Sequence, residues 1–174
     1  TKTLAAIALA LVPALVWPQG GIDWNAPFPP HRVAGNVYFV GTEVLGTFLI
    51  TTPEGHILIN SDFESTVPII RESVAALGFE FEDIEIVLGS HAHGDHSDVS
   101  KVPGHPRVVR ELGETALSPV ARVYGIPSWH DGEGGALRGA NTMFLLDADG
   151  LRLAHLGDIG APLTDAQIAA LGRV

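Results

Sequence analysis

The fold is decided at Ile84-Glu85-Ile86-Val87-Leu88-Gly89-Ser90-His91-Ala92-His93-Gly94-Asp95-His96, where an apolar segment typical of a buried strand runs directly into four side chains that bind metals. Alternate side chains of an extended segment point the same way, so His91 and His93 can share one metal ion. Gly94 lets the backbone turn, and beyond it Asp95 and His96 can face a second metal. Imidazole and carboxylate ligands suit Zn²⁺, and a catalytic zinc keeps one position open for water.

The composition is that of an acidic globular domain. The chain has 174 residues, of which 46% are hydrophobic and 17% charged, enough for one domain with a sizeable core. A formal net charge of −10 without a basic stripe argues against nucleic acid and anionic membranes as partners. The expected partner is a small-molecule substrate. The chain has no cysteine, which removes disulfides, thiolate zinc ligands and cysteine nucleophiles.

Residues 1–20 have the pattern of a secretory signal peptide. Lys2 precedes the apolar run Leu4–Val16, which is too short to span a membrane comfortably, and Pro18 and two glycines follow it. This pattern predicts a periplasmic or secreted protein that has no membrane contact after processing. The sequence leaves a buried N-terminal helix open as the alternative.

Hydrophobic patterns along the rest of the chain predict an α/β protein. The expected strands are Asn36–Thr42, Leu45–Thr52, His56–Asn60, Ile84–Gly89, Arg107–Val109, Arg122–Ile126, Thr142–Leu146 and Leu151–His155. Helices are expected over Glu64–Leu77 and from the capping box Thr164–Gln167 to near Gly172. The segments 18–34 and Ser128–Ala140 are expected to be loops. This order suits a sandwich with helices outside a pair of sheets.

The H-x-H-x-D-H motif after an apolar strand resembles the metallo-β-lactamase superfamily of binuclear zinc hydrolases. Up to His96 the chain resembles the third subclass of metallo-β-lactamases, which use only His and Asp ligands, through Trp24–Pro30, Gly35–Gly41 and Thr51–Asn60. From Ser97 onward it resembles small hydrolases similar to ascorbate-phosphate lactonases, through Asp98–Gly104 and Ile126–Gly135. The chain therefore resembles two branches of one superfamily, joined near His96.

The resemblance implies the αβ/βα sandwich of that superfamily, with residues 21–174 as the hydrolase domain, and it completes a two-zinc site. The first zinc would be held by His91, His93 and His130, and the second by Asp95, His96 and Asp158. From the residues alone, His130 could instead be an ordinary loop histidine and Asp158 a turn or cap residue. His155 is expected to be structural, and His31, His56 and His105 to be exposed to solvent.

The chain departs from the family at two places. Many family members carry an aspartate where Asn60 stands, which changes the support beneath the metals. They also continue beyond the position of Val174 into further strands and another histidine ligand. The resemblance thus implies a C-terminally incomplete fold and a weak second zinc.

The function implied is that of a zinc-dependent hydrolase. Zinc lowers the pKa of a bound water to about 7, and the resulting hydroxide attacks a strained carbonyl. Asp95 would be the catalytic residue that orients this hydroxide and takes its proton. The β-lactam ring of antibiotics is the first expected substrate. Lactone or phosphoester hydrolysis, or an inactive zinc-binding fragment, are the alternatives.

Overall fold

The computed structural model describes residues 21–93, 99, 102–148 and 150–174. The expected signal peptide over 1–20 lies outside the described residues, and so do Asp95 and His96 of the motif. Within the described part of the chain, no helix has both the length and the apolar character needed to cross a membrane.

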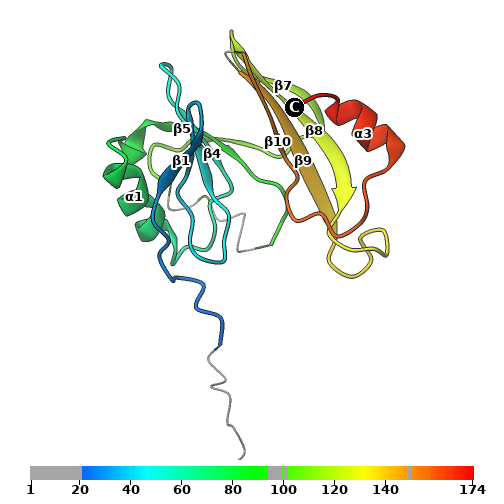
Figure 1. The fold of residues 1–174 in the computed structure, drawn as a ribbon, viewed down its shortest axis with the longest axis horizontal. Helices are drawn as coiled ribbons and strands as arrows, with labels where there is room; N and C mark the ends of the chain where they lie inside the picture. The colour runs from blue at the N-terminus through cyan, green and yellow to red at the C-terminus, as the bar shows by residue number, and fades with distance from the viewer. Residues whose placement is uncertain (1–20, 94–98, 100–101, 149) are drawn as a thin grey trace, which may run out of the picture.

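Two β-sheets face each other, and one helix covers the outer side of each (Figure 1). The first sheet has, in spatial order, β1 (His31–Ala34), β2 (Val37–Phe39), β3 (Phe48–Ile50), β4 (His56–Ile59), β5 (Ile84–Leu88) and β6 (Arg107–Val109). The second, in the order β10-β9-β8-β7, has β7 (Gly113–Ser118), β8 (Ala121–Trp129), β9 (Ala140–Ala148) and β10 (Leu151–His155). Helix α1 (Val67–Ala76) packs on the first sheet and α3 (Asp165–Leu171) on the second, while the 3₁₀ turn η1 (Phe81–Asp83) leads into β5. The predicted αβ/βα sandwich is confirmed.

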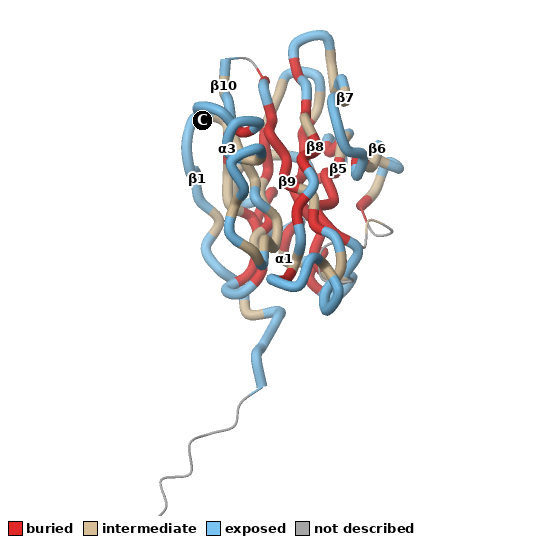
Figure 2. The backbone as a smooth tube through the Cα atoms, turned by 90° about the vertical axis from the view of Figure 1, so that its right-hand side faces the viewer, coloured by how far each residue is buried: buried red, intermediate tan, exposed pale blue. Residues whose placement is uncertain are grey.

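The alternation of side chains along the strands explains the layers. In β4, Ile57 and Ile59 point into the core between the sheets, whereas Leu58 packs in the cluster beneath α1. In β9, Phe144 joins the inter-sheet core while Leu145 packs toward α3. Buried residues accordingly lie along the middle of the molecule, in β5, β8 and β9 (Figure 2). The continuous apolar runs in the sequence reflect strands that are covered on both faces.

Parallel pairing places the metal-binding motif at one edge of the first sheet. Strands β4 and β5 run parallel, and so do β5 and β6, so their carboxyl ends lie at the same edge. Asn60, which follows β4, donates its backbone N–H to the carbonyl of Leu88 at 2.9 Å. The residues after β4 therefore lie directly beside the segment that begins at Gly89 and carries the motif histidines.

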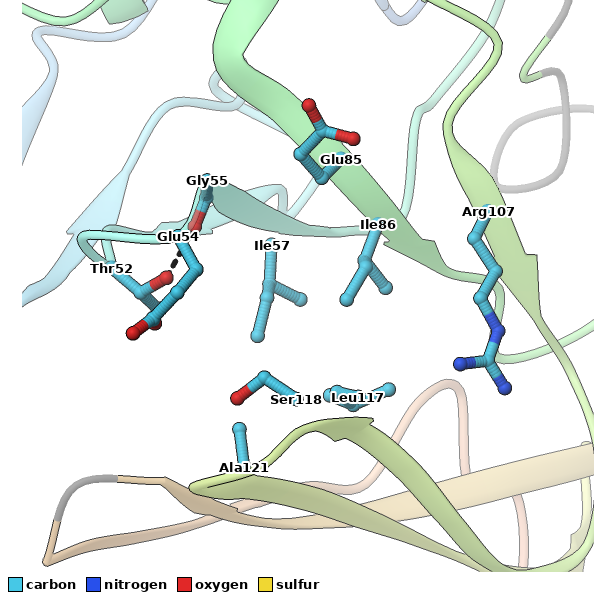
Figure 3. Close-up of a pocket in the computed structure, with 10 residues that line it drawn as sticks. All are labelled: Thr52, Glu54, Gly55, Ile57, Glu85, Ile86, Arg107, Leu117, Ser118 and Ala121. Carbon is cyan, nitrogen blue, oxygen red and sulfur yellow. Dashed lines mark hydrogen bonds between the residues drawn. The ribbon is translucent and has the colours of Figure 1, made fainter.

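The opposite edge of the sandwich, where β4 and β5 begin, contains a separate cavity of about 300 Å³ (Figure 3). Ile57 and Ile86 of the first sheet point toward Leu117 of the second across it. The exposed charged side chains Glu54, Glu85 and Arg107 also line it. None of the predicted metal ligands is among its described lining residues.

The structure corrects several expectations about the elements. Strand β1 lies inside the segment 18–34 that was expected to be a loop, and β7 was not expected at all. Neither strand contains a buried residue, and both have a mixed composition, so they are held by backbone pairing and lack a strong hydrophobic pattern. Strands β8 and β9 are longer than expected. They include Ser128, Trp129 and Ala140, which were expected to belong to the loop Ser128–Ala140. Helix α1 begins at Val67, three residues later than expected.

The prediction that His56 is exposed is wrong. Its ring is buried and packs edge-on against Phe79, with the ring centroids 5.4 Å apart. His31 and His105 are exposed, as predicted.

Candidate metal centre

Three histidines from the two sheets meet at the edge where the motif strand ends. His91 and His93 follow β5, and His130 follows β8. One ring nitrogen of each lies within 4.8 Å of those of the other two, and the ring centroids are 4.9 to 5.0 Å apart. His91 is buried, His130 half-buried and His93 exposed. Together these side chains could hold a metal ion on the solvent side of the cluster.

Asp158 brings a carboxylate to the same cluster. It lies in the loop after β10, and its Oδ2 is 3.5 Å from Nε2 of His130 and 4.0 Å from Nε2 of His91. Four of the six predicted ligands are thus brought together by the fold. The other two, Asp95 and His96, lie outside the described residues, and the ligand role of all six stays a prediction.

A chain of hydrogen bonds orients the ring of His91. The backbone N–H and the hydroxyl of Ser90 both donate to Oδ1 of Asn60, at 3.2 and 3.1 Å. Because the one hydroxyl hydrogen is used there, the Ser90 oxygen accepts from Nδ1 of His91, 3.0 Å away. This network assigns the proton of His91 to Nδ1 and leaves Nε2 free of a proton, facing the cluster. Asn60 therefore provides the acceptor that the family's aspartate was expected to provide.

Asn60 also has an unusual backbone. Its φ is 60°, in the left-handed region that asparagine tolerates better than most residues. The side chain is fully enclosed, at 1% exposure. This residue is fixed both by its turn and by its side-chain contacts, directly beneath the motif.

Asn141 performs the corresponding task for Asp158, and sequence reasoning missed it. Oδ1 of its buried amide accepts a hydrogen bond from the backbone N–H of Asp158 at 3.0 Å. Nδ2 of the same amide donates to the carbonyl of Leu156 at 2.9 Å and to the hydroxyl of Ser128 at 2.6 Å. Gly157 lies against it with φ 58°, and a Cβ there would come within 2.2 Å of the amide oxygen. The Gly-Asp pair was the one visible signal of this arrangement.

The two sheets are joined directly beneath the cluster. The backbone N–H of Thr142 in β9 donates to the carbonyl of Ser90 at 2.7 Å. Ser90 thus contacts Asn60 of the first sheet with its side chain and the second sheet with its backbone. This bond sets the edge of β9 against the residue that precedes His91.

Asp131 organises the loop between β8 and β9, and sequence reasoning missed this role too. Its buried carboxylate accepts four backbone N–H groups at 2.7 to 3.1 Å, from Glu133, Gly135, Leu137 and Arg138. Burial raises the pKa of Asp131, but these four hydrogen bonds lower it further, so the net pKa lies below its usual value. The Gly-rich segment is therefore folded around one carboxylate, immediately after His130.

A cavity of about 520 Å³ opens over the histidines. Its lining residues are Trp24, Val44, Leu45, Gly46, His93, His130, Arg138 and Asp158. The lining residues from the N-terminal part of the chain are mostly apolar, whereas those from the segments after β5, β8 and β10 are polar. Phe28, by contrast, packs against Phe39 and His31.

Comparison with known proteins agrees with this geometry. The sequence profile of the family described as "Beta-lactamase superfamily domain" matches residues 36–174, a range that includes both sides of His96. Several solved structures have the same fold. The FEZ-1 metallo-β-lactamase from Legionella gormanii is 29% identical, with a TM-score of 0.55, over 76% of this chain and 64% of that one. A β-lactamase from Chitinophaga pinensis is 30% identical, with a TM-score of 0.55, over 79% and 64%.

A third neighbour is MEM-A1, a subclass B3 metallo-β-lactamase from a soil metagenome library. It is 24% identical, with a TM-score of 0.56, over 76% of this chain and 63% of that one. At this identity the similarity shows the fold alone. The chain thus spans less than two thirds of the length of these three proteins. The predicted resemblance to the metallo-β-lactamase superfamily is confirmed, while the resemblance of the C-terminal part to small lactonases stays a prediction. Because the profile covers most of the chain and the fold agrees with it, this chain belongs to the β-lactamase superfamily.

Proposed function

We propose that this chain is a zinc-dependent hydrolase that opens the β-lactam ring. The observation that carries the proposal is the convergence of His91, His93 and His130 with Asp158 beside a cavity that His93, His130 and Asp158 line. The similarity to the FEZ-1 metallo-β-lactamase, which is 29% identical, supports it. Support also comes from the His91 network, which keeps a ring nitrogen without a proton directed at the cluster.

The donor set fits zinc. Three neutral imidazoles are a common ligand set of catalytic zinc sites, and they leave one position for water. We assign His91, His93 and His130 to the first ion, and Asp95, His96 and Asp158 to the second. When bound, zinc would supply a water of lowered pKa and a Lewis acid for the carbonyl.

The chain's own residues would then orient and protect the reaction. Asp95 would hold the attacking water and take its proton. The indole of Trp24, which is 40% exposed, and the side chain of Val44 would cover the apolar body of the substrate and exclude bulk water. Asp158 remains fixed by Asn141 while substrate binds, because its backbone is held by a buried amide.

The first test is the zinc content of the metal-saturated full chain by elemental analysis, followed by turnover of a panel of penicillins, cephalosporins and carbapenems. We expect between one and two zinc ions per chain and ring opening that chelators abolish. Zinc without turnover of any β-lactam would favour an inactive zinc-binding fragment. A chain that retains no zinc would overturn the proposal.

The same panel should include lactones and phosphoesters. Residues Ile126–Gly135 resemble small lactonases, and His130 of this segment lines the cavity together with Arg138. Faster turnover of lactones or phosphoesters than of any β-lactam would move the assignment to that branch.

We also propose that residues 1–20 direct the chain out of the cytoplasm, where β-lactam hydrolysis would confer antibiotic resistance. Fusing residues 1–20 to a reporter that is active after export tests this, with residues 21–40 as the matched control. A reporter that stays inactive would contradict it.

A further inference from the structure

One histidine near the cluster is not among the predicted metal ligands. His155 is the last residue of β10, shortly before Asp158. It lies on the same side of the strand as Leu151 and Leu153, which pack against the core between the sheets. Its half-buried ring contacts the ring of Phe48 in β3, with the centroids 6.1 Å apart. The side chain of His155 therefore faces the first sheet, although it belongs to the second.

The ring of His155 binds the backbone of the turn that leads to Asp158. The N–H of Gly157 donates to Nδ1 of this ring, at 3.1 Å. A ring nitrogen that accepts a hydrogen bond has no proton, so the proton of the neutral ring is on Nε2. The arrangement corresponds to the turns in which an asparagine or aspartate side chain binds the backbone two residues ahead. One contact thus fixes both the turn and the tautomer of His155.

Two side chains share the backbone groups of this turn. Asn141 binds the carbonyl of Leu156 and the N–H of Asp158. The N–H of Gly157, which lies between these two groups along the chain, donates to His155. Gly157 has φ 58°, and its Cα lies so close to the Asn141 amide that a Cβ would meet Oδ1 at 2.2 Å. The turn therefore has little room to adopt another position.

The position of this turn sets the position of the Asp158 carboxylate. Its Oδ2 lies 3.5 Å from Nε2 of His130 and 4.0 Å from Nε2 of His91, and these two rings come from different sheets. The N–H groups of Gly157 and Asp158 are held by different side chains. Loss of either contact would let the backbone next to the carboxylate rotate, which would change its distance to both rings.

We propose that His155 is a positioning residue for Asp158. Its neutral ring, with the proton on Nε2, accepts the N–H of Gly157 and so keeps the carboxylate of Asp158 beside the histidine cluster. The role depends on the acceptor nitrogen of His155, which acts through the backbone, and goes beyond the packing of its ring on Phe48. The effect on zinc rests on the proposed function, in which Asp158 is a metal ligand, whereas the effect on the turn does not.

Two substitutions separate the acceptor from the ring. His155→Phe keeps a ring that can pack on Phe48 and removes the acceptor. His155→Asn removes the ring and keeps an acceptor, since Oδ1 of asparagine can take the place of Nδ1. The readout is the amide exchange rate of Gly157 in the metal-free full chain, relative to the amides of β9, which report overall stability.

We expect this relative rate to rise about tenfold in His155→Phe and to stay within about threefold of the wild type in His155→Asn. The reverse order would overturn the proposal, because the ring and not the acceptor would then hold the turn. Equal rates in all three proteins would overturn it as well.

The tautomer of the wild-type ring gives a readout that needs no variant to fold. Nitrogen NMR of the metal-free chain above about pH 8, where unperturbed imidazoles are neutral, shows which ring nitrogen has the proton. We expect the proton of His155 on Nε2. A proton on Nδ1 would overturn the proposal, because that nitrogen could not accept the N–H of Gly157.

Zinc competition titrations test the effect on the cluster. We expect zinc to bind about tenfold more weakly to His155→Phe, and within about threefold of the wild type to His155→Asn. His31→Phe is the matched control, because it makes the same replacement at an exposed histidine of the first sheet, and it should keep the wild-type affinity. Wild-type affinity in His155→Phe would overturn the link to Asp158. If the wild type binds no zinc, the proposed function fails, and the exchange and tautomer measurements decide the role of His155 by themselves.

Discussion

The two sheets contribute to the histidine cluster in different ways. The first sheet supplies His91 and His93 from one short segment that continues β5, so their proximity follows from the sequence itself. The second sheet supplies His130 and Asp158 from two separate loops, after β8 and after β10. Those loops are held in place by the buried polar side chains of Asp131 and Asn141.

This difference shows where precision comes from. Two ligands that lie two residues apart in the sequence, in the bend that follows β5, need only that strand to be packed. Ligands on loops need their backbone N–H groups satisfied by partners elsewhere, since an unsatisfied buried group destabilises the fold by about 1–3 kcal/mol. We therefore expect the second-sheet side of the site to be more sensitive to buried polar substitutions than to changes in its apolar core.

The largest effect should come from His91 itself, which would break the cluster from the first-sheet side. His91→Ala removes the buried ring that is closest to the core, and we expect zinc affinity and turnover to fall by more than the roughly tenfold to hundredfold typical of residues that support a ligand. Metal titration and steady-state kinetics measure this. His105→Asn is the control, because His105 is exposed and has φ 56°, which asparagine tolerates. Equal losses in the two variants would contradict the assignment.

Asn141→Leu should destabilise the loop that carries Asp158 on the second-sheet side of the cluster. The substitution leaves the N–H of Asp158 and the carbonyl of Leu156 without their partner. We expect the free energy of unfolding to fall by about 2–4 kcal/mol, as measured by urea denaturation. The exposed Asn25→Ala should change it by no more than about 0.5 kcal/mol. A similar, small change in both variants would mean that the Asp158 loop does not depend on this amide.

Asp131→Asn should loosen the loop that carries His130 and Arg138. Because hydrogen bonds hold the pKa of Asp131 below its ordinary value of 3.8, the carboxylate's contribution is fully present above that value and is lost as pH falls through the lower folded-state pKa. We expect faster amide exchange in residues 133–138 for the variant at neutral pH, and zinc affinity lower by about tenfold. Exchange that matches the wild type would contradict this. Glu114→Gln is the control, because Glu114 is an exposed residue of the same sheet.

The smallest effect on zinc affinity is expected at Asn60, where two substitutions separate the role of its charge from the role of its hydrogen-bond acceptor. Asn60→Asp keeps the acceptor for Ser90 and introduces the charge that the resembled family carries, so zinc affinity should change by less than tenfold. Asn60→Ala removes the acceptor and should lower the affinity by about tenfold or more. Zinc competition titrations distinguish the two variants. An Asn60→Ala protein with wild-type affinity would mean that Ser90 alone orients His91.

The sequence predicted those features that depend on local pattern. The sandwich and the position of the motif at a strand end could be anticipated from the residues, and the convergence of His130 and Asp158 on that edge through the family resemblance. The roles of Asp131 and Asn141 could not, because a polar residue shows its partners only when the chain is folded. The expectation that His56 is exposed was wrong, because a polar residue at the start of a strand does not reveal from the sequence that Phe79 packs against it. The predicted ligand roles of Asp95 and His96 stay predictions.

The hydrogen bond from Thr142 to Ser90 gives the cluster a further significance. It is a direct link between the sheets at the level of the histidines, so their separation there is already set before any ion binds. A metal held by His91 and His130 would then join two distant parts of the chain. Unlike a disulfide, this link is lost when the chain unfolds, so the stability gained would be the free energy of metal binding to the folded edge and would rise with the metal concentration.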